Sequence, residues 1–147
     1  MRLLGIDYGS KRVGLALSDE RGRFAMPLQV LTNQFVKSSK ESRETYIQKL
    51  IAEVAGIARK NNVSEVVIGE SKNYEGEANA IMHESLEFKK SLEAEGFIVH
   101  LEPEFMTSVQ AERLQDELKG KEGMLDASAA AVILQSYLDR GNAGTMI

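Results

Sequence analysis

The chain has 147 residues, a formal net charge of −4, 43% hydrophobic residues and no cysteine, as expected for one soluble domain with a single core. The missing cysteines exclude disulfides, thiolate zinc sites and a cysteine nucleophile. We expect a cytoplasmic protein without a membrane partner, because the sequence shows neither a leader nor an apolar run long enough to cross a bilayer.

Three short strands are predicted at the start of the chain. Residues 3–7 are an apolar run that ends at Asp7, and a glycine turn follows. Residues 13–18 alternate larger apolar side chains with small ones, which is the period of a strand. Residues 23–31 form a third strand, in which Pro27 requires an edge position or a bulge because proline donates no hydrogen bond. Strands joined by short turns form an antiparallel meander.

Helices and strands alternate through the rest of the chain. Helical spacing of apolar residues predicts amphipathic helices, and short apolar runs predict parallel strands between them. The expected elements are a helix over 43–60, a strand over 65–69, a helix that includes Ile81 to Leu92 and closes at Gly96, a strand over 97–101, a helix from Thr107 to about Lys119 and a last helix from Asp126 to Asp139. This order predicts an α/β fold with a mixed five-stranded sheet (βββαβαβαα) and helices on both faces. We expect a single domain over residues 1–140 and a frayed tail over residues 141–147.

Asp7 is the most informative acidic residue. It follows an apolar strand and precedes a glycine turn, so its carboxylate is expected where the first strand leaves the core. A buried ion is costly unless it is paired or bound to a metal, which makes Asp7 a candidate metal ligand. The alternative is a turn-capping aspartate or a partner for Lys11 or Arg12.

Three further acids occupy positions that favour a role at the same place. Glu70 directly follows the central strand and Glu104 comes just past the fifth, and ligands collect beyond the carboxyl ends of parallel strands. Asp126 is a good helix N-cap, and one carboxylate can both cap a helix and bind a metal. Taken singly, Glu70 and Glu104 are also compatible with exposed loop residues, and Asp126 with capping alone.

Together the four carboxylates predict a metal site. Three strand ends and one helix start bring Asp7, Glu70, Glu104 and Asp126 toward one edge of the sheet, where they would repel one another without cations. Mg²⁺ prefers oxygen ligands, and two ions about 4 Å apart can activate a water and stabilise a leaving oxygen in phosphodiester hydrolysis. We therefore expect two Mg²⁺ or Mn²⁺ ions, and no histidine is required.

The charges are divided unevenly along the chain. Residues 1–60 carry 11 Lys and Arg against 6 Asp and Glu, whereas residues 61–147 carry 7 against 16. Such a division allows a basic surface beside an acidic site, as a metal-dependent nuclease needs, although the two halves interleave in space. Lys11, Arg12 and Lys72 lie in loops near the predicted site and are candidates to hold phosphates, or are simply solvated charges.

The motifs resemble those of one known family. The string from Gly5 to Asp19 (GIDYGSKRVGLALSD) resembles the opening of the YqgF/RuvX family of Holliday junction resolvases and pre-16S rRNA nucleases. The similarity continues through residues 25–28 and 66–69, Asn73, Gly76, Thr107, Ser108, Ala111, Asp126, Ala129, Ala130 and residues 133–139. It covers nearly the whole chain in order, and it implies a ribonuclease-H-like fold with divalent-metal-dependent nuclease chemistry. The family's catalytic acids fall on Asp7, Glu104 and Asp126.

Two stretches depart from the family pattern. The family usually has Asp-Glu-Arg-Leu-Thr-Thr where residues 103–108 read PEFMTS, so the acid remains but Phe105 replaces an arginine that would contact phosphate. The usual Gly-Leu-Pro after the central strand is here GES over residues 69–71, so Glu70 adds an acid where related junction resolvases also place one. The rate and the substrate preference are therefore open at this stage.

The resemblance implies a nucleic-acid partner, either precursor rRNA, with processing of the 5′ end of pre-16S rRNA in ribosome biogenesis, or branched DNA such as a Holliday junction. The sequence does not decide between a monomer and a homodimer. Two other functions stay open. One is a non-catalytic nucleic-acid-binding module of ribosome assembly that lost turnover with the arginine. The other is an ATP-binding phosphotransferase-like domain of the actin and hexokinase type, although such proteins need two of these domains around a nucleotide.

Overall fold

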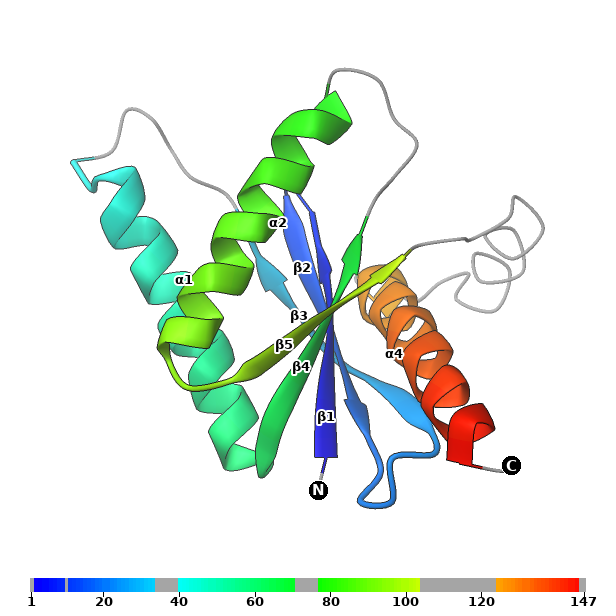
Figure 1. The fold of residues 1–147 in the computed structure, drawn as a ribbon. Helices are drawn as coiled ribbons and strands as arrows, with labels where there is room; N and C mark the ends of the chain where they lie inside the picture. Colours follow the sequence, from blue (N-terminus) through cyan, green and yellow to red (C-terminus); the bar gives the residue numbers. More distant parts are fainter. Residues whose placement is uncertain (1, 10, 34–39, 71–76, 104–123, 146–147) are drawn as a thin grey trace.

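The computed structural model describes residues 2–9, 11–33, 40–70, 77–103 and 124–145. This part of the chain contains strands β1 (Arg2–Tyr8), β2 (Arg12–Ser18), β3 (Ala25–Thr32), β4 (Val63–Glu70) and β5 (Ile98–Pro103) and helices α1 (Arg43–Lys60), α2 (Glu77–Ala94) and α4 (Met124–Thr145) (Figure 1). The helix predicted between Thr107 and Lys119 lies outside the described residues. No helix that the structure describes is long and apolar enough to span a membrane.

One five-stranded sheet carries the described strands in the order β3-β2-β1-β4-β5. β1, β2 and β3 pair antiparallel as the predicted meander, while β4 and β5 run parallel to β1. β3 is an edge strand, and its pairing with β2 shifts register between Leu15 and Ala16, where Ala16 is the partner of Pro27. Pro27 therefore has both predicted features, an edge strand and an irregular pairing.

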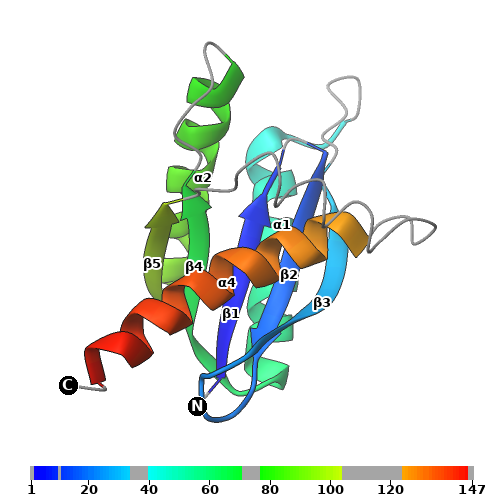
Figure 2. The same cartoon turned by 90° about the vertical axis from the view of Figure 1, so that its right-hand side faces the viewer.

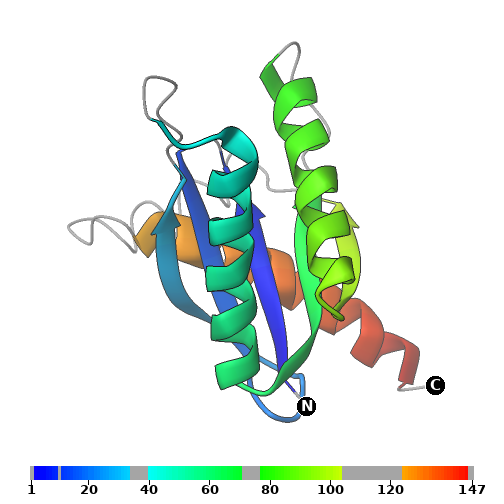
Figure 3. The same ribbon diagram turned by 90° about the vertical axis from the view of Figure 1, so that its left-hand side faces the viewer.

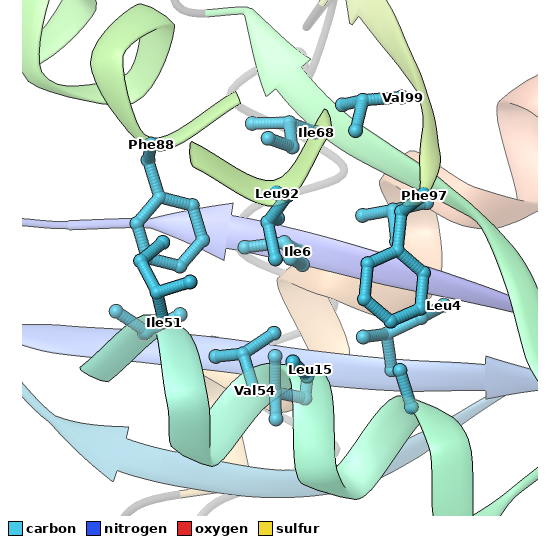
Figure 4. Close-up of a cluster of buried hydrophobic side chains, with 14 of the residues drawn as sticks. Leu4, Ile6, Leu15, Ile51, Val54, Ile68, Phe88, Leu92, Phe97 and Val99 are labelled. Atoms are coloured by element: carbon cyan, nitrogen blue, oxygen red, sulfur yellow. The ribbon is translucent and has the colours of Figure 1, made fainter. Parts of the chain in front are cut away.

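The helices cover both faces of the sheet, as predicted. α1 and α2 lie on one face, and α4 runs obliquely across the other (Figure 2 and Figure 3). Strand alternation sends Leu4 and Ile6 of β1 into the larger core under α1 and α2, where Figure 4 shows side chains from both helices meeting those of the strands. Leu3 packs instead in the smaller core under α4, so Gly5 and Asp7 share the α4 side with it.

Local capping explains where α1 begins and where α1 and α2 end. The Ser42 side chain accepts a hydrogen bond from the Thr45 backbone N–H (3.1 Å) at the start of α1. α1 ends at Lys60 with Asn61 as its C-cap, and Asn62 adopts a left-handed conformation (φ 58°) that turns the chain toward β4. Gly96 (φ 102°) follows α2 in a conformation that glycine adopts without strain. The predicted helix over 43–60 and the predicted stop at Gly96 are confirmed.

The last helix is longer than the sequence predicts. α4 runs from Met124 to Thr145 rather than from Asp126 to Asp139, so Asp126 is the third helical residue instead of the N-cap. Residues 141–145 of the predicted tail are helical as well. Packing accounts for the extension, because Leu138 is buried against the sheet and Arg140 forms an ion pair with Glu102 of β5.

Candidate active site

Asp7 is the next-to-last residue of β1 and is half-buried on the α4 side of the sheet. β1 and β4 are parallel and in register, with Ile6 beside Ile68. Asp7 is therefore level with Gly69, and Glu70 ends β4 one residue further along. The structure thus brings the chain positions of Asp7 and Glu70 to the same edge of the sheet, at the carboxyl ends of two neighbouring parallel strands.

The contacts of α4 with β1 show the direction in which the helix crosses the strand. A Cβ atom at Gly5 would lie 2.7 Å from the Leu134 Cβ and 2.9 Å from the carbonyl oxygen of Ala130, so the helix backbone is very close to the strand there. One turn further along α4, Leu138 packs in the same cluster as Leu3. Successive turns of α4 therefore move toward the start of β1, and the two elements cross antiparallel.

This direction places the first turns of α4 relative to Asp7. Residue 126 precedes Ala130 by four positions, which is about one helical turn. Because α4 and β1 cross antiparallel, the turn that contains Asp126 lies on the side of Gly5 toward Asp7. The structure therefore brings the start of α4 toward the same end of β1 that carries Asp7.

The side chains of the other predicted ligands lie outside the described part of the structure. The side chains of Glu70 and Asp126, and the whole of Glu104 and Lys72, are outside the described residues. Asp7 is thus the one predicted metal ligand with a described side chain, and the described residues contain no group of three or more His, Asp or Glu that could hold an ion. The four-carboxylate site stays a prediction.

Lys11 and Arg12 are exposed and lie at the turn between β1 and β2, a few residues after Asp7. The Gly9 N–H donates to the carbonyl oxygen of Arg12 at 3.0 Å and closes this turn. A Cβ atom at Gly9 would lie 2.8 Å from the same oxygen, so a larger residue could not occupy the position without a shift of the backbone. A tight turn therefore carries two basic side chains at the edge where β1 ends.

A buried acid that the sequence did not reveal is Glu102 of β5. It pairs with Gly69, is 4% exposed, and forms an ion pair with Arg140 of α4. Burial raises the pKa of Glu102, and the nearby Arg140 guanidinium only partly offsets this effect. Gly69 lies between Asp7 and Glu102 in the register of the sheet, and a side chain at Gly69 would meet Ile133, so Ile133 fills the space above Gly69 between the two acids. Glu102 therefore anchors α4 to β5, and β4 lies between it and Asp7.

Arg140→Met is expected to destabilise the protein by about 1–3 kcal/mol at about pH 8, because it leaves the buried Glu102 carboxylate without its cation. Since burial raises the pKa of Glu102, the folded variant takes up a proton more readily than the unfolded chain does. Measured from about pH 5 to 8, its stability relative to wild type is therefore expected to fall as the pH rises. Urea unfolding of both proteins across this range measures the effect.

Arg43→Met serves as the matched control. Arg43 pairs with Glu84 at 2.9 Å, but both side chains are accessible to solvent (49% and 31%). The loss of this surface pair should cost less than about 1 kcal/mol and should depend little on pH between 5 and 8. The role assigned to Glu102 would be wrong if Arg140→Met lost the same stability at both ends of the pH range.

The strand order, the α4 layer and the aspartate at the end of β1 define a ribonuclease-H-like α/β domain. The structure of Thermus thermophilus RuvC in complex with a Holliday junction substrate matches with a TM-score of 0.60 and 19% identity, covering 97% of this chain and 96% of that chain. Fowlpox virus resolvase in complex with Holliday junction DNA matches with a TM-score of 0.57 and 13% identity, covering 95% and 98%. These likenesses confirm the predicted fold.

The family model described as "RuvX: Holliday junction resolvase" matches residues 1–140, and the chain belongs to this family. It is 34% identical over 145 residues to the "Putative pre-16S rRNA nuclease" of Ruminiclostridium cellulolyticum, with 95% of each chain covered. It is 37% identical over 145 residues to the protein of the same name from Protochlamydia amoebophila, with 94% of this chain and 93% of the other covered. The predicted resemblance is confirmed.

Proposed function

We propose that this protein is a divalent-metal-dependent endonuclease that hydrolyses phosphodiester bonds of a structured nucleic acid. The observation that carries the proposal is the position of Asp7, a half-buried carboxylate at the carboxyl edge of β1, with the first turns of α4 lying toward it. Membership of the RuvX family supports the same chemistry. Precursor 16S rRNA is the substrate that we favour, because the relatives over 30% identical carry that name.

The donor atoms at this edge fit a hard divalent cation. Asp7 supplies carboxylate oxygens, and Glu70, Glu104 and Asp126 would add oxygens alone, the ligand type that Mg²⁺ and Mn²⁺ take. Two ions held there would supply an activated water and stabilise the leaving oxygen. The backbone of Asp7 is fixed by strand pairing with β2 and β4, so its carboxylate would be positioned before substrate arrives.

The substrate backbone would be held by the basic turn that follows β1. Lys11 and Arg12 are exposed at this turn, and Lys72 follows β4 in the sequence. Positive side chains of this kind neutralise phosphates without reading bases, which suits a nuclease that recognises a folded RNA by shape. Their role would be more important in this chain than in proteins with the usual family arginine, because Phe105 stands at that position.

The presence of Phe105 in place of the usual arginine favours one alternative function. A chain that lacks the arginine could bind its nucleic acid without cutting it, which would make the protein a non-catalytic module of ribosome assembly. Such a module would bind RNA equally well in EDTA and in Mg²⁺, whereas the proposed nuclease needs the ions for turnover.

The test uses labelled precursor 16S rRNA and a synthetic four-way DNA junction, each with EDTA, Mg²⁺ or Mn²⁺. We expect cleavage of the RNA near the 5′ end of the mature 16S sequence in either metal and none in EDTA. Preferential cutting of the junction would keep the nuclease mechanism and change the substrate. Tight binding of the RNA without cleavage under any condition would reject the nuclease and favour the assembly module.

A further inference from the structure

We infer that Asn33 is a positioning residue that holds the turn after Asp7 in the shape that presents Lys11 and Arg12 to a phosphate backbone. Asn33 follows the end of β3, far from the candidate metal ligands in the sequence. The inference rests on the proposed nucleic-acid substrate, but it concerns a different residue and a different physical role. The observation behind it is a set of hydrogen bonds between Asn33 and the backbone of this turn.

Asn33 contacts both ends of the turn. Its side-chain Nδ2 donates to the carbonyl oxygen of Gly9 at 2.6 Å, and its backbone N–H donates to the carbonyl oxygen of Lys11 at 2.8 Å. The turn is closed internally by the bond from the Gly9 N–H to Arg12. One residue thus fixes both carbonyl groups that flank the turn, and with them the backbone from which the Lys11 and Arg12 side chains project.

The chemistry of the site requires an amide at this position. The Gly9 carbonyl oxygen can only accept a hydrogen bond, so its partner must be the Nδ2 group, and Oδ1 is left facing the Tyr46 hydroxyl, which donates to it at 3.0 Å. The amide of Asn33 is buried, with the residue 6% exposed. An aspartate would place a carboxylate oxygen against the Gly9 carbonyl, and an alanine would leave that carbonyl and the Tyr46 hydroxyl without these bonds.

The support comes from the face of the sheet opposite to the candidate active site. Tyr46 belongs to α1, and the neighbouring Arg43 pairs with Glu84 of α2 at 2.9 Å. Tyr8 packs its ring on Phe88 of α2, with 5.0 Å between the ring centroids. The helices α1 and α2 therefore support the turn from their own side of the sheet. Asp7 lies on the other side of the sheet, the side that faces α4.

Three variants separate positioning from a general effect on folding. Asn33→Ala removes the bonds to Gly9 and to Tyr46, and we expect about a tenfold loss of kcat/KM on the cleaved RNA, mostly through KM. Tyr46→Phe removes the bond to Oδ1 but keeps the bond from Asn33 to Gly9, and it should lose less than about threefold. The activity of Asn33→Asp should depend on pH. Relative to wild type, this activity is expected to fall as the pH rises from about 6 to 9, because only the protonated acid can donate a hydrogen bond to Gly9. The titratable and charged side chains around residue 33, which are Tyr8, Tyr46, Arg43 and Glu84, are unchanged in that variant.

A measurement that does not depend on catalysis completes the test. Amide hydrogen exchange at Gly9 should be about tenfold faster in Asn33→Ala, while exchange at Phe97, whose N–H bonds to Leu92, should be unchanged. Unchanged exchange at Gly9, or an Asn33→Asp activity ratio that is flat with pH, would overturn the inference. If the wild type cuts neither substrate, the proposed nuclease fails, and exchange at Gly9 together with RNA affinity still decides the role of Asn33.

Discussion

Asp7→Asn is expected to abolish metal-dependent cleavage, with a loss of kcat on the order of 10² to 10⁴, while the protein stays folded. The substitution keeps the size of the side chain and removes the negative charge that attracts the ions. Asp7 lies at the edge where the other predicted carboxylates are expected, so the neutral amide also removes carboxylate repulsion. The thermal unfolding temperature is therefore expected to stay the same or to rise. Single-turnover cleavage and thermal unfolding, measured on the same preparations, check both parts.

Asp19→Asn provides the control, since it makes the same chemical change at the hairpin between β2 and β3. The Asp19 carboxylate accepts the backbone N–H groups of Arg23 (2.8 Å) and Phe24 (3.1 Å), and these bonds hold the pKa of Asp19 below its ordinary value. This variant should lose some stability and no activity, the opposite of Asp7→Asn. Full cleavage by Asp7→Asn would remove Asp7 from the candidate active site.

The regular elements could be predicted because their signals are local. The period of apolar residues places α1 over the same residues in the sequence and in the structure, and Pro27 correctly predicts an edge strand with irregular pairing. Asp7 stands out for a local reason as well, because an acid directly after an apolar run is costly unless it has a partner.

What the sequence could not show depends on contacts between distant residues. Glu102 falls just past the strand predicted over 97–101, and its burial appears only when Arg140, 38 positions later, is placed beside it. Asn33 lies in a polar stretch without periodicity, and its role appears only when β3 brings it next to Gly9. The extension of α4 past Asp139 has the same origin, because burial of Leu138 and the Arg140 ion pair outweigh the low helix propensity of Gly141.

The approach of α4 to β1 is the tertiary contact on which the candidate active site depends most. Chain order alone brings Asp126 to the start of a helix, and only the close contact at Gly5 fixes how far that helix is from Asp7. Gly5 therefore has a physical reason to be glycine in the opening motif. The helix backbone occupies the space that any side chain would need.

Gly5→Ala is accordingly expected to destabilise the protein by about 1–3 kcal/mol or more. The new Cβ would meet the Leu134 Cβ at 2.7 Å and the Ala130 carbonyl at 2.9 Å, and neither atom belongs to the flexible end of a side chain. The helix must move away from the sheet, and its first turns then shift relative to Asp7. Since a misplacement of about 1 Å can cost on the order of 10² in rate, cleavage should fall even at temperatures where the variant is fully folded.

Substitutions at two other glycines provide comparisons for Gly5→Ala. A Cβ at Gly69 would meet the Ile133 Cδ1 at 2.5 Å, but that atom ends a side chain that can rotate, so Gly69→Ala should cost less than Gly5→Ala. Gly56 is exposed within α1 and has nothing within 4 Å of a new Cβ, so Gly56→Ala should stabilise the protein by about 0.5–1 kcal/mol. Urea unfolding of the three variants gives the order, and cleavage by the folded proteins shows whether only Gly5→Ala loses activity. If Gly5→Ala had the stability and the activity of the wild type, the close packing of α4 on β1 would not control the candidate active site.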